Sequence, residues 1–374
     1  MRGVNPVRTA GEIGVAVVVS PHGFGHAARI SAVIESLCAL RPDLTIHLLT
    51  TVPRWFFADG LTCRFKLHRV TTDVGLVQRN PLEEDLGATV HRLDRLLASP
   101  AGPMDRIATT IGRLGCRLVM CDISPLGLAA ARRLGLPGVL VENFTWDWIY
   151  RGYDPSHPRL LEHGRTMAGF FRGSDLHIQT EPWCRKAAGG KGVAPVARRS
   201  LTPPPVTRSR LGVSDGDPLV LLTMGGVRWN YRALATLENH PRAHFVVPGG
   251  ADRADRRGRL TVLPFRSGFH HPDLVAASDV VVGKLGYSTV AEAHQSGAAM
   301  AYIARPRFPE SGVLAEFVQR TMFSMEITEE GFNDGSWVEP LDELLRRPRR
   351  RPPATDGAGQ AARLILDRFD GELG

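Results

Sequence analysis

The sequence is poor in features that mark secreted, zinc-binding or membrane-spanning proteins. Its five cysteines are an odd number and form no CxxC pair, which argues against a disulfide framework or a zinc site. No apolar run approaches the roughly 18 residues that a membrane span needs, and the amino-terminal residues contain no signal-peptide core. We therefore expect reduced thiols in a cytoplasmic protein.

Lysine is scarce, because four of the 46 basic residues are lysines and the rest are arginines. Against 38 acidic residues they give a net charge of +8, spread along the chain without a basic helix or an aromatic-interleaved motif. This pattern predicts no nucleic-acid partner. It permits anionic ligands or peripheral contact with an anionic membrane surface. It indicates no oligomeric state.

Apolar segments alternate with helical patterns, as in two doubly wound α/β domains. The continuous run Ile13 to Ser20 is typical of a strand inside a parallel sheet, and a glycine-rich turn leads from it into a helix. Helices are predicted over 82–97 and 103–114, and the arginines of 346–351 are predicted to form a solvated turn. The expected parts are a first domain at 1–195, a linker at 196–216, a second domain at 217–345, and a basic turn and helix at 346–374.

The segment Asp279 to Glu292, DVVVGKLGYSTVAE, is the strongest indication of a ligand site. Its valines predict a buried strand, the turn around Lys284 ends it, and Ser288 or Thr289 is placed to cap the next helix. A helix start presents free N–H groups and partial positive charge, which suit a phosphate. Glu292, one turn on, is placed to accept hydrogen bonds from a sugar's hydroxyl pair. The spacing predicts a nucleotide site; the alternative is an ordinary strand–turn–helix connection with a surface lysine.

Residues 143–150, NFTWDWIY, concentrate aromatic side chains in one loop and helix start. Aromatic walls are common in ligand clefts, so Asn143 and Trp146 are candidates for contact with an acceptor substrate. The alternative is that these aromatics form an interior core.

Together the motifs resemble the GT-B fold of nucleotide-sugar glycosyltransferases over nearly the whole chain. The stretch from Lys284 to Glu292 is similar to the His-Cys-Gly-Trp-Asn-Ser-x-x-Glu core of UDP-glycosyltransferases, and to the matching segment of the bacterial lipid II N-acetylglucosaminyltransferase. HGFGHAAR, CDISP, NFTWDWIY and GKLGYSTVAEA further resemble the N-terminal, non-kinase part of plant-type L-arabinokinases and its stand-alone bacterial relatives. The kinase part has no counterpart in these residues.

The resemblance implies roles in binding a sugar donor. In those families hydroxyl residues and backbone amides hold the diphosphate and a glutamate holds the ribose, which corresponds to Ser288, Thr289 and Glu292 here. Lys284 replaces a phosphate-side histidine and keeps a cation. The acid that helps to grip the donor sugar falls at Glu310, and its usual glutamine partner is missing. The other donor residues implied are Gly225, Gly226, Arg228, Phe265, Gly286 and Tyr287.

The glycine-rich turn after the first strand supplies the candidate catalytic base. His26 resembles the histidine that UDP-glycosyltransferases use as a general base, and Asp122 stands at the position of its carboxylate partner. Histidine, with an unperturbed pKa of about 6.5, suits removal of an acceptor's proton, and a carboxylate on the other ring nitrogen fixes its tautomer. His22 is the alternative base. The acceptor side of the site is expected to include His22, Phe24 and Gly25.

The same turn also fits the dinucleotide fingerprint, as Gly23-x-Gly25-x-x-Ala28, but the second strand ends with no acidic residue for a ribose. The resemblance therefore remains the better guide, and it implies an inverting transferase of hexosyl or N-acetylhexosaminyl type with a UDP-sugar as donor. No cofactor or metal is predicted, because fixed dipoles and cations can meet the diphosphate's charge. The alternatives are a nucleotide-sugar epimerase and a non-catalytic sensor of nucleotide sugars. The resemblance also implies that the final helix packs back on the first domain.

Overall fold

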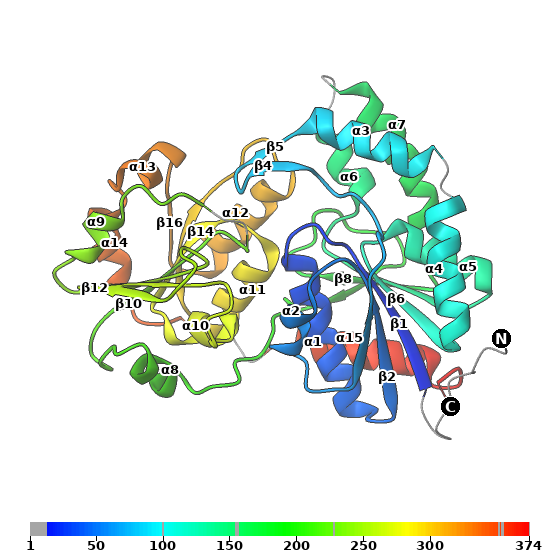
Figure 1. Ribbon diagram of the computed structural model, residues 1–374, viewed down its shortest axis with the longest axis horizontal. Coiled ribbons are helices and arrows are strands. Elements are labelled where there is room, and N and C mark those ends of the chain that lie inside the picture. Colours follow the sequence, from blue (N-terminus) through cyan, green and yellow to red (C-terminus); the bar gives the residue numbers. More distant parts are fainter. Residues whose placement is uncertain are drawn as a thin grey trace.

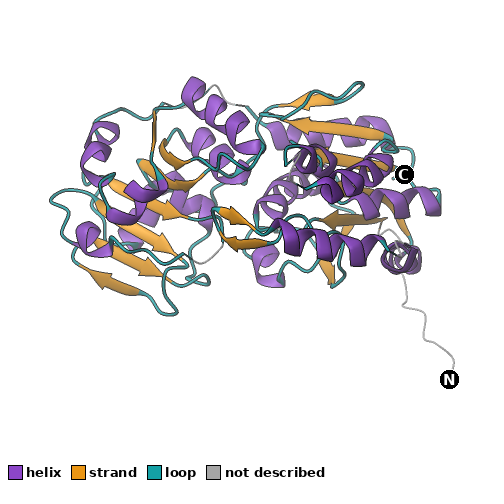
Figure 2. Cartoon of the chain, turned by 90° about the horizontal axis from the view of Figure 1, so that it is seen from above, coloured by secondary structure: helices purple, strands orange, loops and turns teal. Residues whose placement is uncertain are grey.

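The computed structural model describes residues 13–98, 101–153, 157–226, 229–350, 352 and 355–373. These residues form two lobes, each with a mostly parallel sheet between helices (Figure 1). Figure 2 shows the two lobes from above, with helices lying over the strands of each sheet. The predicted class, α/β with two doubly wound domains, is confirmed.

The first lobe is built on the sheet β3-β2-β1-β6-β7-β8-β9, whose neighbouring strands run parallel. Its strands are β1 (Ile13–Val19), β2 (Leu44–Leu49), β3 (Phe65–His68), β6 (Cys116–Asp122), β7 (Gly138–Glu142), β8 (Leu176–Thr180) and β9 (Lys191–Val193). Its helices are α1 (Gly25–Leu40), α2 (Arg54–Ala58), α3 (Leu86–Leu97), α4 (Ala101–Leu114), α5 (Pro125–Leu134), α6 (Trp146–Arg151) and α7 (Pro158–Phe171).

The second lobe is built on the sheet β12-β13-β11-β10-β14-β15-β16, in which only the β12–β13 pair among the described pairs is antiparallel. Its strands are β10 (Leu219–Thr223), β11 (His244–Pro248), β12 (Asp255–Arg257), β13 (Leu260–Leu263), β14 (Val280–Lys284), β15 (Ala299–Ile303) and β16 (Ser324–Glu326). Its helices are α8 (Pro204–Arg210), α9 (Leu234–Glu238), α10 (His271–Ala277), α11 (Tyr287–Ser296), α12 (Glu310–Thr321), α13 (Glu329–Asp334) and α14 (Val338–Leu345).

Strand β1 shows why its sequence is a continuous apolar run. Val15, Val17 and Val19 face the core on one side of the sheet, and Ala16 and Val18 face the core on the other. All five side chains are fully buried. A strand covered on both faces has no solvent side and therefore no polar alternation. Full burial of one valine contributes about 1.5–3 kcal/mol, so this strand anchors the lobe.

The last helix, α15 (Gly357–Phe369), crosses from the end of the second lobe to the first (Figure 1). Ala361, Ile365 and Phe369 are buried in the same core as the valines of β1. Arg349, on the segment that precedes it, donates to the carbonyls of Ala276 at 2.7 Å and Ser278 at 2.5 Å. The prediction that residues 346–351 form a solvated turn is therefore wrong for Arg349, which fastens this segment to α10.

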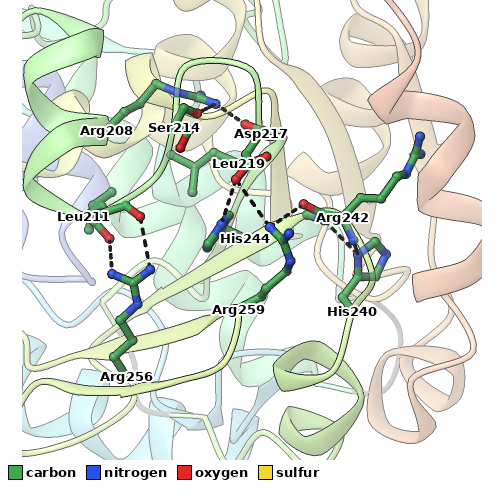
Figure 3. Close-up of polar contacts among 12 residues, drawn as sticks. Arg208, Leu211, Ser214, Asp217, Leu219, His240, Arg242, His244, Arg256 and Arg259 are labelled. Carbon is green, nitrogen blue, oxygen red and sulfur yellow. Dashed lines mark hydrogen bonds and ion pairs between the residues drawn. The ribbon is translucent and has the colours of Figure 1, made fainter.

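The predicted linker contains an ordered helix, α8, that an arginine-rich network attaches to the amino ends of β10 and β11 (Figure 3). Asp217 accepts hydrogen bonds from His244 Nε2 at 3.2 Å and from Arg259 Nη1 at 3.5 Å. Arg208 of α8 donates to the Asp217 carbonyl, and Arg256 Nη1 donates to the Leu211 carbonyl at 3.2 Å. Some of the many arginines therefore stabilise the fold at the amino ends of the strands.

The helix predicted from residue 82 begins at Leu86 instead. A short hairpin, β4 (Gln78–Asn80) with β5 (Glu83–Glu84), precedes it. The Asp85 carboxylate accepts a hydrogen bond from the Ala88 N–H at 2.8 Å and so fixes the start of α3. The hairpin leaves Glu84 free to reach the second lobe.

Candidate active site

A cavity opens between the lobes at the carboxyl ends of both sheets. Residues that follow β1, β7, β10, β13, β14 and β15 line it, which is where doubly wound sheets bind ligands. Most of the predicted site residues line this one cavity: His22, Phe24, Gly25, His26, Asn143, Gly225, Gly226, Phe265, Lys284, Gly286, Tyr287, Ser288, Thr289, Glu292 and Glu310.

Three predicted site residues are not among them. Asp122 lies one layer deeper, behind His26. Trp146 is fully buried and packs against the rings of His22 and His26, so its predicted contact with an acceptor is wrong and it belongs to the core. The aromatic segment was ambiguous because core and cleft walls use the same side chains. Arg228 lies outside the described residues.

The structure brings His26 and Asp122 together, with Nδ1 and Oδ1 2.9 Å apart. Arg29, one helical turn after His26, donates to the same carboxylate through Nε at 2.8 Å and Nη2 at 2.6 Å. Burial alone would raise the pKa of Asp122, but the charge of Arg29 and the hydrogen bonds from both partners outweigh burial and lower this pKa. An ionised Asp122 can only accept, so His26 Nδ1 carries a proton, and in the neutral ring Nε2 is the nitrogen with the lone pair.

His22 is suited to donate a hydrogen bond and is a poor base. Its Nδ1 accepts a hydrogen bond from the Leu76 N–H at 3.3 Å, which leaves the proton on Nε2. Burial first, and then the charges of nearby basic side chains, hold the pKa of His22 well below its ordinary value. Of the two histidines predicted as the base, His26 therefore has the better geometry for proton removal.

Helix α11 begins at the cavity, but its cap differs from the prediction. Gly286 is the N-cap residue, and neither Ser288 nor Thr289 caps the helix. The Val290 N–H donates to the Gly286 carbonyl at 3.0 Å, so the N–H groups of Tyr287, Ser288 and Thr289 lie in the first turn, ahead of the helical ladder. The Ser288 hydroxyl instead reaches the other lobe (below). The free amides and the helix dipole favour an anion here.

Two cations, Lys284 and Arg305, lie beside the start of α11 at the ends of the neighbouring strands β14 and β15. Burial first, then the charge of Arg305, lowers the pKa of Lys284 to about 7, against the opposing effect of Glu310 and Glu84. Arg305 Nη1 pairs with Glu84 Oε1 at 3.4 Å, and Asn143 Nδ2 donates to Glu310 Oε1 at 2.7 Å. Because Glu84 and Asn143 belong to the first lobe, these contacts join the lobes. An anion bound here would favour the charged form of Lys284.

Glu292 is held by two basic partners. Its Oε1 accepts from Arg198 Nε at 2.8 Å and its Oε2 from His271 Nδ1 at 3.0 Å. Burial alone would raise the pKa of Glu292, but the charge of Arg198 and the hydrogen bond from His271 lower it to about 2. Each carboxylate oxygen keeps a further lone pair, so Glu292 can still accept from a ribose hydroxyl.

The Gly225-Gly226 turn fits between side chains of both lobes. Its φ angles are +67° and +82°, in the left-handed region that favours glycine. A Cβ on Gly226 would lie 2.1 Å from Phe24 Cδ2, and one on Gly225 would lie 3.1 Å from Lys284 Cε. The Phe24 ring stacks on Phe56 with centroids 4.7 Å apart. The turn therefore needs its glycines for the lobes to approach this closely.

The second lobe also contributes an apolar wall, made by Pro248, Phe265, Phe269 and Leu274. Phe265 lies close over Gly249, because a Cβ at that glycine would be 2.5 Å from Phe265 Cε1. A planar ring can pack against such a wall.

The sequence reasoning missed three arginines of this site. Arg29 stands three residues after His26, so helical periodicity alone places both on one face of α1. Arg305 is the second residue after β15, the neighbour of β14, so sheet adjacency could have placed it near Lys284. Arg198 comes from the predicted linker and carried no local signal.

Each of the five cysteines is a free thiol. In the described ranges there is no group of three or more His, Cys, Asp or Glu side chains that could hold a metal ion. No helix among these residues is long and apolar enough to span a membrane.

No protein-family model matches the chain. L-arabinokinase of Arabidopsis thaliana is 27% identical over 346 residues, which are 88% of this chain and 32% of that protein. The chain thus spans about a third of the length of this relative. A protein of Methanopyrus kandleri named as an uncharacterized glycosyltransferase is 23% identical over 273 residues, 70% of this chain and 78% of that protein.

Solved structures share the fold over nearly the whole chain. The glycosyltransferase of kitacinnamycin has a TM-score of 0.64 and 14% identity, over 96% of this chain and 99% of that one. A UDP-glucosyltransferase of Polygonum tinctorium has a TM-score of 0.59 and 13% identity, over 98% and 94%. MurG of Acinetobacter baumannii has a TM-score of 0.53 and 14% identity, over 96% and 99%. The fold is GT-B, as the sequence motifs predicted.

Proposed function

We propose that this chain is a glycosyltransferase that moves a sugar from a UDP-sugar to a small-molecule acceptor. The second lobe binds the donor and the first lobe binds the acceptor. In the donor site the first-turn amides of α11, with Lys284 and Arg305, bind the diphosphate. Glu292 accepts from the ribose, and the base packs on the apolar wall. A UDP-linked donor is proposed because a protein of the same fold is named as a UDP-glucosyltransferase.

One observation carries this proposal: the start of α11 and the histidine of α1 face the same cavity, and the first turns of the two helices are in contact. The Ser288 hydroxyl donates to the Gly25 carbonyl at 2.7 Å, so the first turns of the two helices are in contact. His26, the residue after Gly25, lines the cavity together with Thr289. A sugar attached to a diphosphate at α11 therefore has its anomeric carbon within reach of an acceptor held at His26.

The proposed reaction uses His26 and Asp122 of the first lobe. His26 Nε2 takes the acceptor's proton as the acceptor oxygen attacks the anomeric carbon, while Asp122 on Nδ1 stabilises the imidazolium. The attack is a single displacement with inversion and forms no covalent sugar intermediate. Charge that develops on the leaving diphosphate is met by the amides of α11, Lys284 and Arg305, which are fixed in place before the reaction. These dipoles and cations suffice without a metal ion.

The test combines donor binding with turnover. Thermal-shift screening of nucleotide sugars selects the donor, and UDP release is then measured with lipid, natural-product, peptide and sugar acceptors. His26→Ala should lower turnover by about 10²–10⁴-fold, while the Kd for UDP stays within about twofold. His91→Ala, at an exposed histidine of α3, is the control and should leave both unchanged. Normal turnover in His26→Ala, or conversion of the sugar without any acceptor, would contradict the proposal.

A further inference from the structure

Arg29 is a buried cation of the first lobe. It contacts both His26 and Asp122, and it also touches the second lobe. Arg29 is only 1% exposed. Removing a guanidinium from water is costly unless its N–H donors find partners. Two of its nitrogens bind Asp122 and a third binds the Asn143 side-chain oxygen. Its guanidinium carbon lies 5.0 Å from the centroid of the Tyr287 ring, on α11 of the second lobe.

The contact between Arg29 and His26 is of a different kind. Arg29 Nη2 lies 3.3 Å from His26 Nδ1. Because Asp122 is ionised and Nδ1 carries a proton, both nitrogens are donors and no hydrogen bond can form between them. When Nε2 also takes a proton, the imidazolium acquires a positive charge next to the guanidinium. Like charges at this separation disfavour the charged form of histidine.

We propose that Arg29 is a positioning residue that holds Asp122 in place and opposes the positive charge that His26 acquires when its ring takes a second proton. This inference rests on the proposed function of His26. A carboxylate alone would favour a protonated histidine, and the bidentate arginine offsets that effect. Several titratable and charged groups surround Arg29 and His26. They are Asp122 and Cys121 on β6, His22 in the preceding turn, Tyr287 on α11, and further out Asp73, Glu142, Cys184, Lys284, Arg305 and Glu310.

Arg29 also connects the base to the donor side of the cleft. Asn143 accepts from Arg29 Nη1 and donates to Glu310 Oε1 at 2.7 Å. Asp122, Arg29, Asn143 and Glu310 thus form one buried chain from β6 to the start of α12. The same guanidinium that lies against His26 therefore also holds the Asn143 amide that faces the second lobe.

The test follows the His26 ring itself and needs no turnover. The full chain is labelled with isotopic histidine, His26 is assigned by loss of its signal in His26→Gln, and its NMR shifts are followed with pH. In Arg29→Met the titration midpoint of His26 should move to higher pH by about 1–2 units, because Asp122 is no longer neutralised. In Arg29→Lys, which keeps the charge, it should stay within about 0.5 unit of the wild type.

Arg41→Met, at the other end of α1, is the matched control, because Arg41 is ion-paired with Asp43 and Asp370 and should leave the His26 midpoint unchanged. Once a donor and acceptor are known, the acid limb of kcat/KM should move with the midpoint. A midpoint that stays or falls in Arg29→Met overturns the inference, even if His26 proves to be the base. If Arg29→Met does not fold, Arg29→Gln should show the same rise, and a rise of one unit in Arg29→Lys would overturn the role of charge. If the His26 midpoint rises as predicted in Arg29→Met but the wild type shows no transferase activity, only the proposed function is contradicted.

Discussion

Lys284 gives the sharpest quantitative prediction for the donor site. With a pKa of about 7, it is about one-tenth protonated at pH 8 in the free protein. A bound diphosphate places negative charge beside it and should return its pKa toward the ordinary value of about 10.4. Binding at pH 8 should therefore take up about 0.9 proton per UDP, and at pH 6 only about 0.1 from this group. The terminal phosphate has a pKa of about 6 and is already ionised at pH 8.

The assay is isothermal titration calorimetry of UDP at pH 8 in buffers of different ionisation enthalpy. Lys284→Met should abolish the proton uptake. It should also lower the affinity for UDP by about 10–150-fold, because a charged hydrogen bond worth about 1.5–3 kcal/mol is lost. Lys191→Met, at an exposed lysine of β9, should change neither quantity. Uptake below about 0.3 proton in the wild type, or uptake that persists in Lys284→Met, would refute the reasoning.

Two other substitutions test the contact between the lobes and the ribose site. Gly226→Ala should lower the free energy of unfolding, measured in urea, by about 1–3 kcal/mol, because its Cβ would lie 2.1 Å from Phe24 Cδ2. Gly216 has open space around it, so Gly216→Ala is the control and should not lower this free energy. Equal losses in the two variants would contradict the close packing at Gly226. Arg198→Met should lower the free energy of unfolding by about 1–3 kcal/mol at pH 7 and by much less near pH 2. The reason is that the pKa of Glu292 is about 2 in the folded protein and about 4.3 in the unfolded chain. The stabilisation from ionised Glu292 is therefore present above about pH 4.3 and disappears as the pH falls through about 2. An equal loss at both pH values would contradict the ion pair.

The parts of the site that lie on strands and their turns could be predicted from the sequence. Buried parallel strands are continuous apolar runs, and a ligand site must lie where they end. The exact ends were less predictable. Strand β14 continues through Lys284 because Lys284 pairs with Ile303 of β15, so this lysine is half-buried instead of lying in an exposed turn. Such pairing depends on the neighbouring strand and leaves no mark on the local pattern.

The contacts between the lobes and the burial of single side chains were the least predictable features. Ser288 has the chemistry of a helix cap, but its hydroxyl bonds to Gly25 across the cleft, so tertiary structure overrides the local preference. Helical periodicity places Arg29 on the same face as His26, but it does not show that the guanidinium is buried and bound to Asp122. Trp146 was assigned to the cleft, but it is fully buried. An aromatic segment has the same sequence pattern whether it forms an interior core or the wall of a cleft. Each error concerns which surface a known side chain faces.

The affinity of the wild-type chain for UDP relative to uridine, measured by calorimetry in one buffer, tests the central claim most directly. If the amides of α11, Lys284 and Arg305 form a diphosphate site, UDP should bind at least about 100-fold more tightly than uridine, as expected for two or more charged hydrogen bonds. Equal affinity for the two ligands, or no binding of UDP at all, would contradict the claim.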